Sequence, residues 1–334
     1  MRTRRLLTLG AAALALVCSV GPVAGAATID PADPIGGARR AERAHAFDGT
    51  LRVAWRADGG WRTRTFTVHS DAGSLAVEGG ATTTARGDVR AIVDGASAHV
   101  LWDRPAAPGP SITGKYAVEV SATARDTVAG RAAFRVTVRD RRGRTREVLA
   151  LDASTGLLLR RVTLDEAGRR MRVVAFERVD VAATPTAGEP TQVPDRTAGR
   201  APAPVRTVVA PYVLVRRLPG GFRLVGVYRA AGGRELFFSD GLYGVSVFQW
   251  RGALDRSALP EGGRTGGSAA HGARTYDSPL GPVSVWSDDD LTFSVVSETT
   301  PTETARIVAE LPGSAAPGSI DGVGGLLVAP FTLP

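Results

Sequence analysis

Short stretches in which apolar and polar residues alternate, each closed by a turn signal, dominate this sequence. Leu51, Val53 and Trp55 alternate with polar residues, and similar runs recur between turns such as the one at 58–60. Alternation with a period of two is typical of strands with one face in a core. Regular turn signals join such strands to their neighbours as antiparallel pairs. Over residues 38–182 we therefore predict one strongly curved antiparallel sheet or unclosed barrel.

A second block of the same character spans residues 211–312 and is predicted to be a smaller β domain that ends in a helix. Thr300 and Glu303 form a capping box with Pro301 at the first helical position. One further helix is predicted over about 38–46, with Asp33 and Pro34 as its N-cap and first residue. The expected fold class is mainly β with few helices (α+β).

Three segments rich in Pro and Gly separate or flank these blocks. Residues 27–37 are interpreted as a flexible lead, and residues 183–210 as a linker, because such segments cannot bury enough apolar surface to offset their ordering entropy. Residues 313–334 form a Gly/Pro-rich tail with one apolar stretch at 325–331. That stretch is either a loose end or a docking strand, and both interpretations stay open.

The first 26 residues have the pattern of a secretory signal peptide. Three arginines precede an apolar run that is too short to span a bilayer, and small residues at 24–27 place the cleavage after Ala26. Two variants remain open: a twin-arginine signal at Arg4-Arg5, and lipoprotein anchoring through Cys18. Cleavage after Ala26 removes Cys18, the single cysteine, so the mature chain has no disulfide and depends on burial for its stability. We expect a water-soluble protein of the cell envelope or beyond.

The basic charge does not indicate a nucleic-acid partner. Without the three arginines of residues 1–26 the formal net charge of +8 becomes +5. The arginines are scattered along strands without interleaved aromatic residues, and Lys115 is the sole lysine. At most, this charge favours acidic partners or an anionic envelope surface.

No constellation of residues predicts catalysis or a cofactor. The four histidines lack the spacings of zinc sites, and no nucleophile elbow, phosphate-binding loop or dinucleotide fingerprint is present. The acidic run at 288–290 lacks the spacing of a calcium loop and is interpreted as a solvated turn. We therefore predict no metal, no cofactor and no enzymatic activity.

Large aromatic residues offer a different kind of site. A curved sheet with one helix can enclose an apolar cavity for an acyl chain or a peptide. An ordinary core is the alternative interpretation of the same residues, and both stay open. The candidate cavity residues are Trp55, Phe66, Trp102, Tyr116 and Phe134.

Several motifs resemble those of the MucB/RseB family of sigma-factor regulatory proteins. Residues 46–51 (AFDGTL) are similar to the family's entry into its first strand, and residues 151–160 (LDASTGLLLR) to a family hairpin. In the second block, residues 218–222 (LPGGF) and 238–248 (FSDGLYGVSVF) resemble two further motifs, of which the SDG sequence is the most specific. The resemblance covers about residues 38–312.

The resemblance implies a LolA/LppX-like first domain and a binding function. Family members bind the extracytoplasmic part of a membrane-spanning anti-sigma factor, shield it from proteolysis, and release it when a lipid-type signal occupies the apolar cavity. The candidate partner-binding motif of this chain is then Ser239, Asp240, Gly241, Tyr243, Phe248 and Trp250. A purely structural hairpin turn at Asp240-Gly241 is the other interpretation.

A carrier or chaperone of lipids or lipoproteins is the alternative function, because the first domain supports it equally. The second domain favours regulation, since a pure carrier does not need residues 211–312. The partner's identity, a bound lipid and the oligomeric state are not determined by the sequence.

Overall fold

The structure is a computed structural model that describes most of the chain between residues 29 and 311, and one short strand beyond it. The predicted signal peptide and most of the linker and tail lie outside the described residues. These residues are 29–57, 59–71, 74–78, 112–182, 207–208, 212–230, 233–265, 270–288, 290–311 and 331–332.

The first element is helix α1 (Pro34–Ala44). Its start confirms the prediction: Asp33 is the N-cap, its side chain accepts a hydrogen bond from the Gly36 N–H, and Pro34 is the first helical residue. The helix ends at Ala44 rather than near residue 46, because His45 is already extended (φ −117°, ψ 136°).

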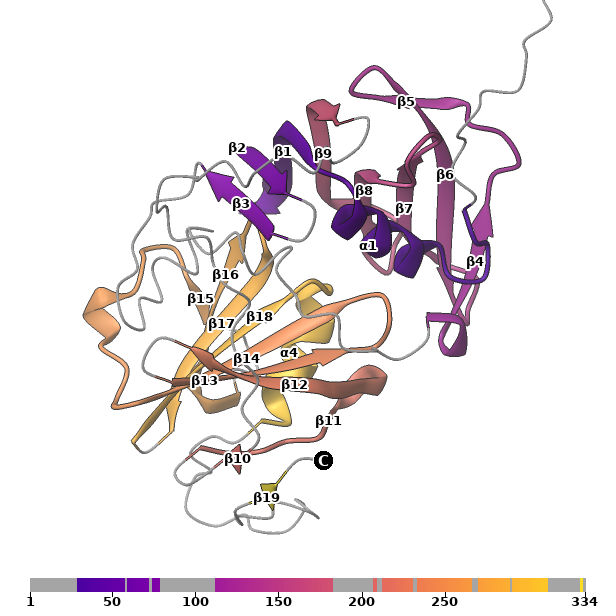
Figure 1. Cartoon of the computed structure of the whole chain (residues 1–334). Helices are drawn as coiled ribbons and strands as arrows, with labels where there is room; N and C mark the ends of the chain where they lie inside the picture. The colour runs from indigo at the N-terminus through magenta and orange to yellow at the C-terminus, as the bar shows by residue number, and fades with distance from the viewer. Residues whose placement is uncertain are drawn as a thin grey trace, which may run out of the picture.

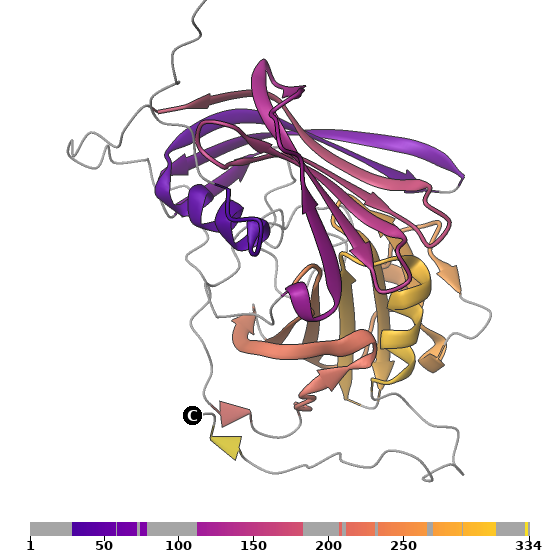
Figure 2. The ribbon, with the colours of Figure 1, turned by 90° about the vertical axis from the view of Figure 1, so that its right-hand side faces the viewer.

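A nine-stranded antiparallel sheet follows and confirms the predicted curved, unclosed architecture. Among the described strands the order is β3-β2-β1-β9-β8-β7-β6-β4, with β5 on β6, so β3 and β4 are the outermost of them. Bulges between β1 and β9, β6 and β7, β7 and β8, and β8 and β9 bend the strands. Figure 2 shows this N-terminal sheet arched over α1 and the second half of the chain. Its strands are β1 (Phe47–Ala57), β2 (Gly60–Asp71), β3 (Ser74–Glu78), β4 (Tyr116–Val120), β5 (Asp126–Val128), β6 (Arg131–Asp140), β7 (Thr145–Asp152), β8 (Leu158–Leu164) and β9 (Arg170–Val181).

The second half forms an eight-stranded antiparallel sheet with helix α4 (Pro301–Ala309) packed on it (Figure 1). The predicted capping box is present, since the Thr300 hydroxyl accepts the Glu303 N–H at 3.2 Å. The strand order of this C-terminal sheet is β11-β12-β13-β14-β18-β17-β16-β15. Its strands are β11 (Arg217–Leu218), β12 (Phe222–Ala230), β13 (Gly233–Ser239), β14 (Gly244–Arg251), β15 (Arg264–Thr265), β16 (Arg274–Ser278), β17 (Gly281–Asp288) and β18 (Leu291–Ser297).

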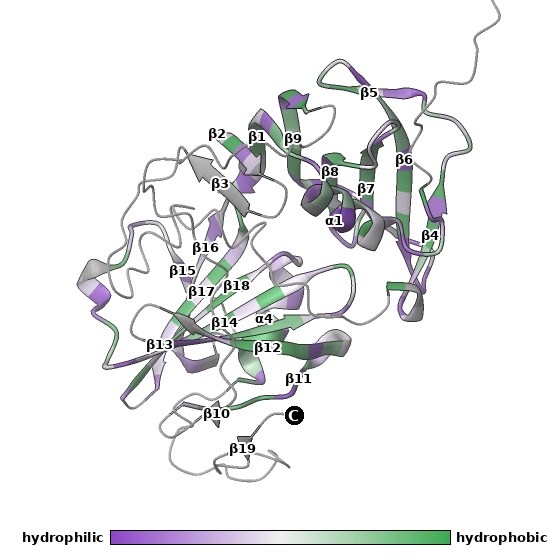
Figure 3. Ribbon diagram, in the orientation of Figure 1, coloured by the Kyte–Doolittle hydropathy of each residue, from purple (hydrophilic) through white to green (hydrophobic). Residues whose placement is uncertain are grey.

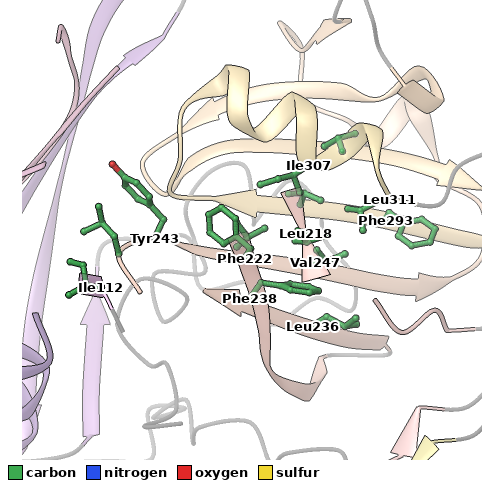
Figure 4. Close-up of a cluster of buried hydrophobic side chains, with 14 of the residues drawn as sticks. Ile112, Leu218, Phe222, Leu236, Phe238, Tyr243, Val247, Phe293, Ile307 and Leu311 are labelled. Carbon is green, nitrogen blue, oxygen red and sulfur yellow. The ribbon is translucent and has the colours of Figure 1, made fainter. Parts of the chain in front are cut away.

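The alternation of side chains along β14 and the preceding Tyr243 separates two hydrophobic clusters. Tyr243, Val245 and Val247 pack into the cluster that contains Ile307 of α4, part of which is drawn in Figure 4. Phe248 and Trp250 belong to another cluster, with Tyr276 and Val283. Both faces of β14 are therefore buried, which agrees with the hydrophobic colouring of this sheet in Figure 3.

The two ends of the C-terminal half meet in a small separate sheet. Strand β10 (Thr207–Val208), from the predicted linker, pairs antiparallel with β19 (Phe331–Thr332), from the predicted tail. The last residue of the apolar stretch 325–331 is thus in a strand, while residues 325–330 lie outside the described part. Among the described residues, no helix is both long enough and apolar enough to cross a membrane.

Gly281, the first residue of β17, tests how tightly the C-terminal sheet is packed. Its φ is +115°, and a Cβ there would overlap the Ser297 carbonyl oxygen. Gly281→Ala therefore adds steric overlap to backbone strain, whereas Gly252→Ala (φ +103°, no atom within 4 Å of the new Cβ) adds strain alone. In urea denaturation we expect the control to lose about 1–3 kcal/mol and Gly281→Ala at least about 2 kcal/mol more. Equal losses would show that the β18 backbone yields freely.

Candidate functional site

One face of the N-terminal sheet carries charged residues where a simple β domain would carry apolar ones. Residues directly opposite one another on neighbouring strands share a face. Glu147, Thr163 and Arg172 stand opposite one another on β7, β8 and β9, and Arg161 stands opposite Leu149 in the next row. Glu147 is fully buried and Arg172 is buried as well. Such charges need partners. Glu147 pairs with Arg161 of its own sheet, whereas Arg161 and Arg172 also reach groups of the C-terminal half.

The turn between β13 and β14 supplies the central partner. Asp240 Oδ1 accepts hydrogen bonds from the Leu242 N–H at 3.0 Å and the Tyr243 N–H at 2.8 Å. The Ser239 hydroxyl accepts the Gly241 N–H at 3.1 Å and donates to the Tyr243 carbonyl at 2.9 Å. Gly241 has a φ of +97°, which favours glycine. The SDG sequence therefore builds a closed turn whose remaining carboxylate oxygen points away from it.

That second oxygen reaches the N-terminal sheet. Asp240 Oδ2 accepts a hydrogen bond from the Tyr116 hydroxyl at 2.7 Å and forms an ion pair with Lys115 Nζ. The Asp240 side chain has no exposed surface. Burial, and secondarily the Asp240 carboxylate, raise the pKa of Tyr116, so the phenol stays protonated and acts as the donor. One carboxylate thus joins the turn of one sheet to the edge strand of the other.

Tyr243 continues the contact between two arginines of the N-terminal sheet. The Arg161 and Arg146 guanidinium carbons lie 5.7 Å and 6.0 Å from its ring centre, within cation–π range. The ring also packs edge-on against Tyr116, with centres 6.3 Å apart. Arg146 in turn forms an ion pair with Glu303 of α4 at 3.5 Å. The aromatic ring is therefore enclosed by cations that are themselves paired.

Arg161 connects a carboxylate of each half. It lies 3.2 Å from Glu147 on its own sheet and 3.5 Å from Glu298, just beyond β18. The other Glu298 oxygen accepts the Gly244 N–H at 2.7 Å, which fixes that carboxylate. Burial raises the pKa of Glu147, against the opposing effect of Arg161.

Two further hydrogen bonds join the N-terminal sheet to the C-terminal half. Arg172 donates to the Leu280 carbonyl at 2.5 Å, and the Thr300 hydroxyl donates to Glu166 at 2.7 Å. Every group contributed by the C-terminal half lies in a turn, at a strand end or in α4. We call this set of contacts the ionic seam: Lys115, Tyr116, Arg146, Glu147, Arg161, Glu166, Arg172, Asp240, Tyr243, Leu280, Glu298, Thr300 and Glu303.

The contacts of the ionic seam hold the two sheets together. Its carboxylates are engaged by arginine, lysine, hydroxyl or backbone N–H groups, which fixes their positions. Among the described residues no group of three or more His, Cys, Asp or Glu side chains could hold a metal ion. Breaking a buried ion pair by removing one partner typically costs about 3–5 kcal/mol, so the seam fixes the relative position of the two sheets.

The residues of the candidate partner-binding motif are not all brought together. Ser239, Asp240, Gly241 and Tyr243 meet in the seam. Phe248 and Trp250 are stacked with ring centres 5.5 Å apart, but they belong to the cluster on the opposite face of β14 from Tyr243.

The candidate cavity residues are also dispersed. Phe66 is buried in a cluster of the N-terminal sheet, with Trp55 packed at its border. Tyr116 is in the seam, and Phe134 is partly buried on β6. Trp102 lies outside the described residues. Trp55 lines a pocket, which is described below.

The sequence pattern does not single out the charges that the N-terminal sheet contributes. Glu147, Arg161 and Arg172 sit in strands that otherwise look apolar, and that interruption was the available signal. Lys115 was noted only as the sole lysine. Pairing partners more than 100 residues apart cannot be identified from spacing alone, because only the folded topology makes them neighbours.

The chain is thus a mainly antiparallel, two-sheet β protein whose halves are joined by buried ion pairs. No known family profile matches it, and no curated protein does. Among solved structures it is similar to MucB in complex with MucA(peri), at 22% identity and a TM-score of 0.45, over 86% of this chain and 100% of that one. It is also similar to the Pseudomonas aeruginosa MucA/MucB complex, at 20% identity and a TM-score of 0.47, over 86% of this chain and 100% of that one. A crystal structure of MucB is similar at 21% identity and a TM-score of 0.48, over 84% of this chain and 97% of that one.

Asp240→Asn separates the two roles of the carboxylate. The amide oxygen can still accept the N–H groups of Leu242 and Tyr243, but the amide nitrogen is a donor that faces Tyr116 and Lys115. We expect a loss of about 3–5 kcal/mol in the free energy of unfolding, because Lys115 loses its nearer charged partner and the Tyr116 hydroxyl loses its acceptor. Differential scanning calorimetry should show the single transition broadening or splitting as the sheets uncouple.

The matched control is Asp165→Asn in the β8–β9 hairpin. Asp165 has the same bonding pattern, with Oδ1 accepting the N–H groups of Ala167 and Arg169 and Oδ2 bound to Arg169 Nε at 2.8 Å. Arg169 is exposed, so we expect a loss of about 1 kcal/mol or less and an unchanged transition shape. If both variants behave alike, the Asp240 carboxylate does not couple the sheets.

Glu303 predicts a pH dependence of stability. Burial raises the pKa of its carboxyl above the ordinary 4.5, although Lys115 and Arg146 oppose the shift. An acid whose pKa is higher in the folded state contributes stability below its unfolded pKa and loses it as the pH rises through the folded value. The difference in the free energy of unfolding between the wild type and Glu303→Gln should therefore favour the wild type most near pH 4.5 and decrease toward pH 7. Urea denaturation at each pH measures this difference. Exposed Glu310→Gln on the same helix is the control, and an equal decline there would contradict the assignment.

Proposed function

We propose that this protein is an exported, non-enzymatic regulator that binds the extracytoplasmic part of a membrane-spanning anti-sigma factor and modulates its proteolysis. The motifs at 151–160, 218–222 and 238–248, with their likeness to the MucB/RseB family, support this function. The observation that carries it is the use of the SDG turn: two of its side chains, Asp240 and Tyr243, hold the two sheets together.

A fixed pair of sheets suits a protein that binds another chain. A surface assembled from two units binds well only if the units are held in the bound arrangement before the partner arrives, because ordering them on binding reduces affinity. Buried ion pairs contribute more to a defined geometry than to net stability in some proteins. We infer that the seam pre-organises the partner-binding surface.

The ionic seam also allows the binding function to be regulated. A signal that favours a separated arrangement of the sheets would lower the affinity for the anti-sigma factor by the same factor as the partner lowers the affinity for the signal. Lipid sensing belongs to this proposal as one form of such a signal. The alternative function, a carrier or chaperone of lipids or lipoproteins, would require acyl binding but no anti-sigma partner.

Binding can be tested with the chain from residue 27 onward and synthetic extracytoplasmic segments of the source organism's single-span anti-sigma factors. We expect saturable binding in isothermal titration calorimetry and protection of the bound segment from added protease. Asp240→Asn should weaken binding at least tenfold, while Asp165→Asn should leave it unchanged.

Two outcomes would count against the proposal. If no segment binds while acyl lipid co-purifies with the chain by mass spectrometry, the carrier function replaces regulation. If a segment binds but Asp240→Asn and Asp165→Asn do so with wild-type affinity, the seam has no part in recognition.

A further inference from the structure

A pocket of about 250 Å³ lies beside the ionic seam and is walled by both halves of the chain. On one side lie Trp55 and Arg62, which stand directly opposite each other on β1 and β2, and Arg64 in the next row. They share a face with Arg172, which pairs with Trp55 across β1 and β9. The other side is built from 260–264 and β16, including Arg264. The pocket therefore lies on the face that meets the C-terminal sheet, next to the seam.

Trp55 gives this pocket an unused hydrogen-bond donor. Its indole Nε1 is buried and has no hydrogen-bond partner. An indole nitrogen can only donate, and leaving a buried donor unpaired costs about 1–3 kcal/mol. Buried indole N–H groups usually find an acceptor, so an unpaired one in the wall of a pocket indicates an acceptor atom on a ligand.

The charges around the pocket select the kind of acceptor. Three guanidinium groups line it, against two carboxylates, Glu261 and Asp277. Asp277 is already held by Arg264 through two hydrogen bonds of 2.5 Å and 2.7 Å. Guanidinium groups bind planar or tetrahedral oxyanions through paired N–H donors, most strongly phosphate and carboxylate.

The size of the pocket limits the ligand. Its volume is below the roughly 300–1,000 Å³ of sites for drug-sized molecules. It equals the space of about eight water molecules at about 30 Å³ each. A phosphate group with a few attached atoms fits this space, and a long acyl chain does not.

We propose that this pocket is a binding site for a phosphate-type anion, held by Arg62 and Arg64 with the Trp55 indole N–H as a third donor. The group can belong to a small phosphorylated solute or to a lipid head group. Because the walls come from both halves, the bound anion stabilises the joined arrangement of the sheets, in proportion to RT ln(1 + [L]/Kd). This site does not depend on the proposed anti-sigma partner.

The test follows the Trp55 indole N–H directly by ¹⁵N–¹H NMR. The chain has five tryptophans, so few indole signals appear, and Trp55→Phe identifies the relevant one by its loss. Inorganic phosphate is titrated at constant ionic strength with sodium chloride. We expect the Trp55 signal to move saturably, while the signal of exposed Trp61 on the same hairpin, assigned with Trp61→Phe, stays in place.

Matched variants separate the pocket from general charge. In isothermal titration calorimetry, Arg62→Gln and Arg64→Gln should each weaken phosphate binding at least tenfold, and Trp55→Phe about threefold or more. Arg52→Gln, an exposed arginine on β1, is the control and should bind as the wild type does. A Trp55 signal that does not move, or one that moves equally with chloride, overturns the proposal. So does equal weakening by Arg52→Gln.

Competition distinguishes the two sources of the anion. Glycerol 3-phosphate that displaces phosphate, with no binding to phosphatidylglycerol vesicles, supports a small solute. Binding to phosphatidylglycerol but not phosphatidylcholine vesicles, abolished by Arg64→Gln, supports a lipid head group. If neither ligand competes with phosphate, the site does not recognise phosphorylated compounds and the proposal fails.

Discussion

The carboxylate of Asp240 is the contact on which the arrangement of this molecule depends. One of its oxygens closes a turn of the C-terminal sheet, and the other accepts from Tyr116 and pairs with Lys115 of the N-terminal half. Because the group is fully buried, it has no water to replace a lost partner, and its two functions cannot be relaxed independently. The rest of the seam repeats this principle. Arginines of the curved sheet bind carboxylates and carbonyl oxygens that project from turns, so a few short contacts position two large sheets.

Most of the fold could be predicted from local pattern. Alternating strands, turn residues and capping signals are short-range, and they led to a curved antiparallel sheet, a second β block and a terminal helix. The structure confirms each of these, including Pro34 and Thr300 at the helix starts. The end of α1 was misplaced by two residues, because the alternation that starts at Phe47 had to be separated from helical residues with no clear stop signal. The pairing order of the strands was not predictable, since it depends on contacts distant in sequence.

The candidate site was predictable only in part. The SDG motif was found through its resemblance to a family motif, but the structure shows that it forms a contact between the halves that no local pattern encodes. Glu147 and Arg161 belong to strands in which a charged residue normally indicates a solvent-facing position. Only the opposite sheet makes those positions buried, so sequence periodicity alone does not identify them as buried. The aromatic residues show the converse limit, because Phe66 and Tyr116 have similar chemistry but lie in different clusters.

The unusual use of arginine in place of lysine leaves one lysine in a chain of 334 residues, and the fold puts it at the contact between the sheets. Lys115 carries the only side-chain amine of the protein. While the sheets are joined, that amine is ion-paired with Asp240 and lies over the Phe222 ring at 5.2 Å, so it is a poor nucleophile. Once the sheets separate, it becomes an ordinary exposed amine. Amine-modifying reagents would thus label a single side chain, at a rate that reports how often the two halves of the molecule come apart.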